Sequence, residues 1–154
     1  MAAGHPPASS RMAGSSRRRP GPGRLHFEIP TDCRESRKAQ FRVLNELVRR
    51  GYSNDSLFAI RLAMEEALVN AMKHGNHFDP AKKIIIDARI GPRSARIAVE
   101  DQGAGFDRRH VGDPTRAINL CKLHGRGIFL IKAYMDQARW TQGGRRVTMT
   151  KANA

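Results

Sequence analysis

The sequence predicts an α+β fold, a two-layer sandwich in which a mixed, mostly antiparallel sheet is covered on one face by helices. Residues 32–50 carry apolar side chains at helical spacing, whereas residues 83–90 and 95–100 are rich in apolar β-branched residues and are separated by a short Gly-Pro turn. The expected order along the chain, β-α-α-β-β-lid-α-β-β, mixes helices with hairpins, as α+β sandwiches do. A chain of 154 residues fits one domain of ordinary size.

The first half of the predicted domain contains one strand and two helices. Apolar and polar residues alternate over residues 25–30, which is the period of a half-buried strand. Thr31 or Asp32 then offers an N-cap for a first helix, which ends at Gly51 because glycine readily adopts the left-handed conformation found there. A longer second helix is expected over residues 55–74, after a Ser-Asn-Asp cap.

The second half is expected to contain two hairpins with a lid and a helix between them. The segment after the first hairpin is rich in Asp, Gly and Pro and shows little periodicity, so it is interpreted as a loop or lid before an apolar helix. A Gly-Gly pair marks the turn of the last hairpin. The expected strands, lid and helix span residues 83–90, 95–100, 101–125, 127–137, 138–141 and 145–151.

The net charge is strongly basic and unevenly distributed. The chain has 28 Lys and Arg against 14 Asp and Glu, a formal net charge of +14, and residues 1–24 hold five arginines and no acidic residue. Residues 1–23 are rich in Pro, Gly, Ser, Ala and Arg, which indicates a disordered basic tail before a folded domain at residues 24–152. The basic charge could attract nucleic acid, but a solvated basic surface is the simpler interpretation of the charge, and an unstructured or over-extended start is the simpler interpretation of the tail. Nucleic acid is therefore not the expected partner.

Composition also disfavours a membrane protein, an exported protein and a zinc protein. No stretch approaches the roughly 18 apolar residues of a membrane helix, and the arginines of the tail are followed by Pro-Gly-Pro-Gly instead of the apolar region of an export signal. Cys33 and Cys121 are far apart, and neither has a second cysteine nearby. Isolated cysteines of this kind do not suit a zinc site and do suit a reducing compartment, so a cytoplasmic location is expected.

The first segment with chemical potential is EEALVNAMKHG at residues 65–75. At about 100° per residue, Glu66 and Asn70 share one face of the predicted helix, and Lys73 continues along that side. A carboxylate can take a proton from an attacking hydroxyl, an amide oxygen can bind Mg²⁺, and a lysine can neutralise a phosphate. The alternative is a plain amphipathic helix with a charged outer face.

A second segment, EDQGAGFD, directly follows a predicted strand. Gly103 and Gly105 let the backbone turn tightly and approach a flat ligand. Asp101 could accept a hydrogen bond from an exocyclic amine of such a ligand. The alternative is an ordinary turn, because Asp-x-Gly is common turn chemistry.

A third segment, HGRGIFLI, places Gly125 and Gly127 around Arg126 where a helix is expected to begin. The free amides and the positive dipole end of a helix N-terminus can hold phosphate, although a flexible loop ending in a helix cap has the same sequence pattern. Each of the three segments is weak evidence alone. Their conjunction within about 65 residues, in this order, is unusual.

This conjunction resembles the Bergerat-fold (GHKL) ATP-binding superfamily. The segments EEALVNAMKHGN, VEDQGAGFD, GRGIFLIKAYMDQ and RRVTMTK, together with the small size, are most similar to the anti-sigma-factor serine/threonine kinases, the RsbW-like proteins. The resemblance covers residues 25–151 and leaves out the tail. It implies that the chain binds ATP and Mg²⁺ and acts as a protein serine/threonine kinase.

The resemblance implies a role for individual residues. Glu66 matches the general base, Asn70 the ligand of Mg²⁺, and Lys73 a cation near the phosphates. Asp101 matches the aspartate that binds the adenine amino group. The remaining matches are Gly103 and Gly105 in the adenine pocket, Gly125 and Gly127 around the phosphates, residues 107–124 as the mobile ATP lid, and Thr148 in the adenine network.

One position departs from the family pattern. Members of this kinase family carry an arginine in the lid just before the glycine pair, placed for the γ-phosphate, whereas Leu123 and His124 stand there in this chain. Lys122 or Arg126 could take over that role. The alternative function is therefore a catalytically weak ATP-binding module that sequesters a protein partner.

The resemblance also implies the partners. The expected substrate is an anti-anti-sigma protein with a STAS domain, and the expected second partner is a sigma factor that the kinase sequesters in a partner-switching pathway of transcription regulation. A homodimer is expected because members of the family are often dimers.

Overall fold

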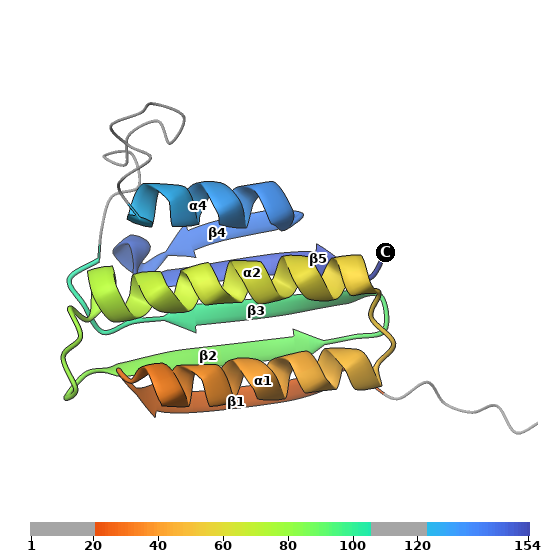
Figure 1. The fold of residues 1–154 in the computed structure, drawn as a ribbon, viewed down its shortest axis with the longest axis horizontal. Coiled ribbons are helices and arrows are strands. Elements are labelled where there is room, and N and C mark those ends of the chain that lie inside the picture. Colours follow the sequence, from red (N-terminus) through yellow and green to blue (C-terminus); the bar gives the residue numbers. More distant parts are fainter. Residues whose placement is uncertain (1–20, 106–122) are drawn as a thin grey trace, which may run out of the picture.

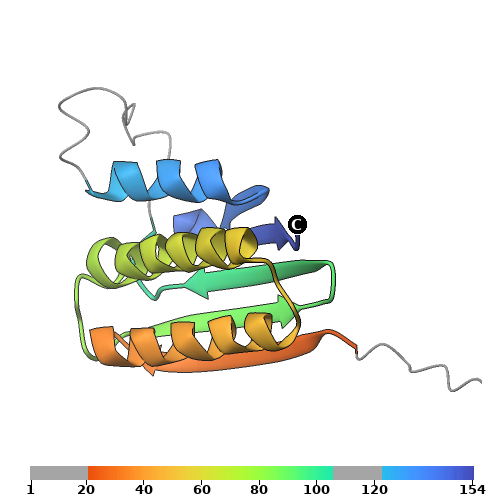
Figure 2. The same ribbon diagram turned by 45° about the vertical axis from the view of Figure 1, so that its right-hand side comes forward.

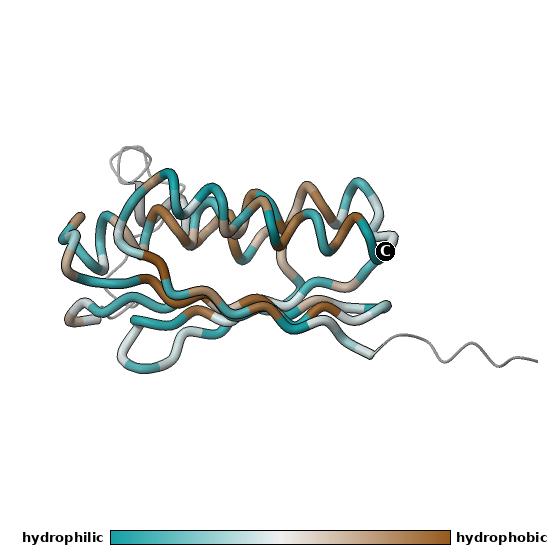
Figure 3. Tube along the Cα trace, turned by 90° about the horizontal axis from the view of Figure 1, so that it is seen from below, coloured by the Kyte–Doolittle hydropathy of each residue, from teal (hydrophilic) through white to brown (hydrophobic). Residues whose placement is uncertain are grey.

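Within the residues that the structure describes, the protein is a two-layer sandwich of one sheet with three α-helices on the same side of it (Figure 3). The computed structural model describes residues 21–105 and 123–154; most of the predicted tail and most of the predicted lid lie outside these ranges. Figure 3 looks along the layers and shows the helices on one side of the sheet. The elements are β1 (Gly23–Pro30), α1 (Cys33–Arg49), α2 (Asn54–Asn70), the π-helical turn η1 (Ala71–Gly75), β2 (Lys83–Ile90), β3 (Ser94–Glu100), α4 (Leu123–Tyr134), β4 (Gln137–Thr141), the 3₁₀ turn η3 (Gln142–Gly144) and β5 (Arg146–Ala152).

The sheet has five strands in the order β1-β2-β3-β5-β4, and every neighbouring pair is antiparallel. In Figures 1 and 2, α1 and α2 lie next to each other over the sheet and α4 lies beside α2. The predicted α+β sandwich is confirmed. The described sheet is wholly antiparallel, where a mixed sheet was expected.

Local capping chemistry sets the ends of the first two helices. The Asp32 carboxylate accepts hydrogen bonds from the backbone N–H groups of Arg34 and Glu35, and α1 begins at the next residue after the aspartate. Ser53 caps α2 in the same way, through Ser56 N–H. Gly51 has φ +76°, the left-handed conformation expected after a helix C-terminus.

The core lies between the sheet and the helices, where apolar side chains alternate along the strands. Burying one such side chain fully contributes roughly 1.5–3 kcal/mol. On β2 every second residue faces the helices, and the helices meet the sheet with aliphatic side chains. The fully buried side chains include Val43, Leu47, Ile60, Met64, Leu68, Ile84, Ile86, Ile90, Ile97 and Met149.

The helix α4 begins and ends earlier than predicted. It runs from Leu123 to Tyr134, whereas residues 127–137 were expected. The chain leaves the helix there because Asp136 is tied to β5: its N–H donates to Thr150 O at 2.9 Å, and its carboxylate accepts from Ala152 N–H at 2.7 Å. Among the helices of the described ranges, none is long and apolar enough to cross a membrane.

Candidate functional site

The first and third segments of the sequence meet where α4 packs against α2. Glu66 and Asn70 lie one turn apart near the C-terminal end of α2 and are half-buried. A Cβ atom added to Gly127 would lie 3.0 Å from Glu66 Oε2 and 3.0 Å from Asn70 Nδ2. The absence of a side chain at this position therefore leaves α4 in direct contact with the carboxylate and the amide.

The helix α4 begins earlier than predicted, so Gly125 lies in its first turn and Gly127 just after it. Gly125 is the third residue of α4 and Gly127 the fifth, because the helix begins at Leu123. The close approach to α2 accounts for glycine at 127. Lys122 and the Arg126 side chain belong to the part of the chain that the structure does not describe.

The end of α2 changes from an α-helix into the π-helical turn η1. Asn76 N–H donates to Ala71 O at 2.8 Å, a bond that spans five residues. Such π turns occur frequently at functional sites. Because the turn changes the spacing after Asn70, Lys73 no longer follows the α-helical period that placed it beside Glu66. Lys73 is half-buried and makes no ion pair with a described residue.

Asp101 is a buried carboxylate at the end of β3, 8% exposed. One oxygen accepts a hydrogen bond from Gly103 N–H at 2.8 Å, and its own N–H donates to Arg145 O at 3.0 Å. Burial raises the pKa of Asp101 above its usual value, and the hydrogen bond from Gly103 opposes this only in part. Burying a carboxylate costs free energy, and a carboxylate with a perturbed pKa of this kind is typical of a site that binds a polar ligand.

Two glycines bring Asp101 against the end of η1. A Cβ on Gly75 would lie 2.2 Å from Asp101 Cγ, and a Cβ on Gly103 would lie 2.0 Å from Gly75 O. Gly105, with φ +84°, approaches the turn of the last hairpin, where a Cβ would lie 2.2 Å from Gly143 O. The loop after β3 can therefore pack here only with glycine at these positions.

Asn76 links this loop to the rest of the fold, and the sequence motifs assigned it no role of its own. Its side chain is 0% exposed. Nδ2 donates to Thr31 Oγ1 and to Lys83 O, both at 3.0 Å, and Oδ1 accepts from Gln102 N–H at 2.8 Å. The residue thus links η1, the start of β2, the entry to α1 and the loop that carries Asp101. Its place directly after the EEALVNAMKHG segment was the one available signal.

Thr148 lies on the other face of the sheet, which corrects its assignment to the adenine network. Its neighbours Val147 and Met149 are buried against the helices, so Thr148 points away from them. It stands opposite Ala98 and Arg139 and lines a hollow on the open face. The sheet separates it from Glu66 and Asn70.

Glu66 and Asn70 on α2, with Asp101 at the end of β3, suit an adenine nucleotide with a divalent cation. The oxygens of Asn70 and Glu66 are hard donors of the kind that Mg²⁺ prefers. Among the described residues, no group of three or more His, Cys, Asp or Glu side chains could hold a metal ion. A Mg²⁺ ion at Asn70 would therefore need further oxygens, and nucleotide phosphates are its usual source in proteins.

Comparison with known proteins identifies the family to which the chain belongs. Residues 29–151 match the model of the histidine kinase-like ATPase domain, so the chain belongs to this family. Within it, the chain is similar to serine-protein kinases named RsbW. It is 27% identical to RsbW of Listeria monocytogenes over 110 residues, covering 67% of this chain and 70% of that protein. It is 29% identical to RsbW of Bacillus licheniformis over 108 residues, covering 66% and 68%.

A solved structure supports the same fold. The crystal structure of the RsbU and RsbW domains of Rv1364c from Mycobacterium tuberculosis matches with a TM-score of 0.59 at 21% identity. The match covers 85% of this chain and 32% of that longer chain. The fold and the family are those expected from the resemblance to anti-sigma-factor kinases.

Proposed function

We propose that this protein is an ATP-dependent protein serine/threonine kinase of the anti-sigma type. In this proposal it phosphorylates an anti-anti-sigma protein with a STAS domain and sequesters a sigma factor in the cytoplasm. The observation that carries the proposal is the contact of Gly127 with Glu66 and Asn70, because it joins two of the three chemical segments. The partners and a homodimeric state rest on the resemblance to the RsbW-like kinases.

The described residues would divide the work as follows. Asn70 offers its side-chain oxygen to the cation, and the Glu66 carboxylate, one helical turn away, takes the proton from the attacking hydroxyl. Bound Mg²⁺-ATP supplies the phosphoryl group and neutralises charge during in-line transfer. The backbone at Gly127 borders this space without filling it. Positioning provides most of the catalysis in such reactions.

Asp101 would select the base. Its carboxylate can accept a hydrogen bond from the exocyclic amine of adenine, whereas the carbonyl oxygen of guanine at that place would face a second acceptor. Leaving a buried acceptor unpaired costs about 1–3 kcal/mol. We therefore propose that the protein prefers ATP to GTP.

Phosphotransfer to a STAS protein tests the kinase directly. The full chain is mixed with Mg²⁺-ATP and candidate STAS proteins of its native host, and phosphosites are mapped by mass spectrometry. We expect phosphoserine or phosphothreonine on the STAS protein, and we expect Glu66→Gln to slow its formation by about 10²–10⁴-fold, the usual contribution of a general base. Glu65→Gln is the matched control, because Glu65 is the exposed neighbour on α2.

The same experiment separates the kinase from the weaker alternative. ATP binding without any transfer to a STAS protein would contradict the kinase and support an ATP-binding module that only sequesters its partner. Equal phosphotransfer rates in the wild type and Glu66→Gln would support a kinase but contradict the role of Glu66 as its general base.

A further inference from the structure

The face of the sheet away from the helices carries a row of three arginines. Arg24 on β1 stands opposite Arg89 on β2, and Arg89 stands opposite Arg96 on β3. All three are exposed. Neighbouring strands are about 4.8 Å apart, so the row places three positive charges side by side across roughly 10 Å of the sheet.

This arrangement is unfavourable for the isolated domain. Like charges directly opposite each other on neighbouring strands destabilise a sheet. Within residues 21–105 and 123–154, none of the three arginines makes an ion pair. The fold alone therefore gives no reason for the row.

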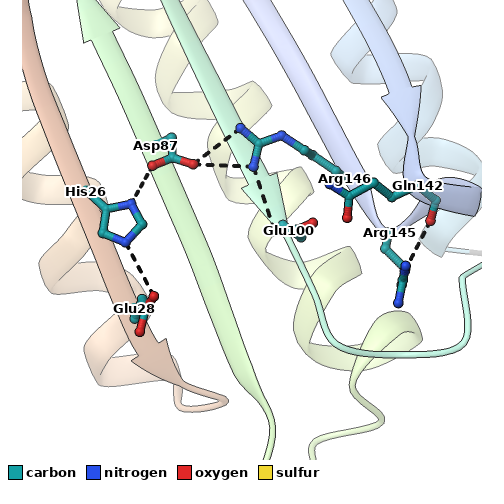
Figure 4. A network of polar contacts seen from close by, with 7 residues as sticks. All are labelled: His26, Glu28, Asp87, Glu100, Gln142, Arg145 and Arg146. Carbon is teal, nitrogen blue, oxygen red and sulfur yellow. Dashed lines mark hydrogen bonds and ion pairs between the residues drawn. The ribbon is translucent and has the colours of Figure 1, made fainter.

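Several other charges on the same face are paired with one another, although the exposed Arg139 on β4 makes no ion pair with a described residue. Figure 4 shows a network in which Asp87 joins His26 and Arg146, and Arg146 reaches Glu100. The distances are 2.5 Å from His26 Nδ1 to Asp87 Oδ1, 3.2 Å from Arg146 Nη2 to Asp87 Oδ2, and 3.8 Å from Arg146 Nη1 to Glu100 Oε2. The acidic residues of this network are thus already occupied by other partners.

The arginine row borders a hollow that could receive a ligand. A depression of about 400 Å³ is lined by Arg24, Arg89 and Arg96 together with residues of the paired network. The row continues across the sheet. Thr150 on β5 stands opposite Arg96, and Gln137 on β4 stands opposite Thr150. Three cations are therefore continued by two neutral groups that can exchange hydrogen bonds with a polypeptide backbone.

We propose that this row, Arg24-Arg89-Arg96, binds an acidic segment of a protein partner. Guanidinium groups bind carboxylates through paired hydrogen bonds, and three arginines match two or three carboxylates. A protein segment fits better than a nucleic acid, because the row is short and Asp87, Glu28 and Glu100 lie on the same face. A longer phosphate backbone would meet these acids.

This surface is separate from the proposed nucleotide site. Glu66 and Asn70 lie in the helical layer, whereas the arginines project from the opposite face of the sheet. Binding of the acidic segment therefore does not depend on the proposed kinase activity, and either proposal can fail without the other.

Binding of a labelled poly-L-glutamate peptide to the full chain tests the inference. In low salt we expect the triple variant Arg24→Gln, Arg89→Gln, Arg96→Gln to bind the peptide about tenfold or more weakly, since each exposed ion pair contributes modestly. The matched control removes three exposed charges from the helical layer, at Arg34, Arg37 and Arg61. We expect the control to lose less than about threefold.

Thermal unfolding checks that the triple variant is folded. Because the row repels itself, we expect the variant to be at least as stable as the wild type. Equal loss of peptide binding in the triple variant and in the control would overturn the inference in favour of net charge.

Two further results would also overturn it. One is an oligonucleotide that binds the wild type more tightly than poly-L-glutamate and is lost in the triple variant. The other is a triple variant that changes oligomeric state in sedimentation while it still binds the peptide, because the row would then contact a second copy of the chain.

Discussion

Replacing Asn76 by alanine should destabilise the fold far more than a typical polar substitution. The Asn76 side chain is fully buried and makes hydrogen bonds to Thr31, Lys83 and Gln102. A hydrogen bond contributes about 0.5–1.5 kcal/mol net, so three bonds amount to about 1.5–4.5 kcal/mol. For a domain of this size, a loss of about 3 kcal/mol lowers Tm by roughly 6–12 °C.

Urea unfolding measures this loss. We expect Asn76→Ala to lower the unfolding midpoint without changing the slope m, because the denatured state exposes the same surface. Asn45→Ala is the matched control: Asn45 is exposed on α1, and such surface changes stay within about 0.5 kcal/mol.

A second variant separates the hydrogen bonds from the loss of volume. Asn76→Asp keeps an acceptor for Gln102 N–H but replaces the donor that faces Lys83 O with another oxygen. We expect this variant to be destabilised as well. If Asn76→Ala lost no more stability than Asn45→Ala, the proposed fastening of the loop by Asn76 would be refuted.

Two further predictions concern the α2–α4 contact and the open face. We expect Gly127→Ala to change the free energy of unfolding by less than about 1 kcal/mol, because the helix preference of alanine offsets the displacement of Glu66 and Asn70. Titration calorimetry of the same variant should nevertheless show weaker binding of Mg²⁺-ATP. An unchanged affinity for Mg²⁺-ATP would contradict the contact between α4 and α2. The hydrogen bond to Asp87 raises the pKa of His26 above 6.5. The contribution of this hydrogen bond to the free energy of unfolding is therefore fully present below pH 6.5 and is lost as the pH rises through the folded-state pKa of His26. An NMR titration should show this raised pKa, returned toward 6.5 in Asp87→Asn; an ordinary pKa in the wild type would refute the pairing.

Features set by local chemistry were predictable from the sequence. The N-caps, the glycine stop at Gly51 and the strand over residues 83–90 depend on neighbouring residues alone, and the structure places them as expected. The face of Thr148 was also readable, because Val147 and Met149 are apolar and side chains alternate along a strand. The resemblance to the family places Thr148 in the adenine network, whereas the alternation along β5 places it on the opposite face of the sheet.

Other features depend on contacts between distant segments. The burial of Asn76 requires the entry to α1, the start of β2 and the loop after β3 to converge on one side chain. The early start of α4 places Gly127 inside a helix, where only its contact with α2 explains a glycine. The arginine row requires the register of three strands, which no single segment encodes.

Titration of the full chain with nucleotides in the presence of Mg²⁺ tests the central claim most directly. We expect that ATP binds and that GTP binds more weakly. We also expect Asp101→Asn to lower ATP affinity by about 10–100-fold, the effect of losing a hydrogen bond to a charged group. Asp55→Asn, at an exposed position in the first turn of α2, should bind ATP like the wild type. Absence of ATP binding, or equal ATP affinity in Asp101→Asn and the wild type, would contradict an adenine site at the end of β3.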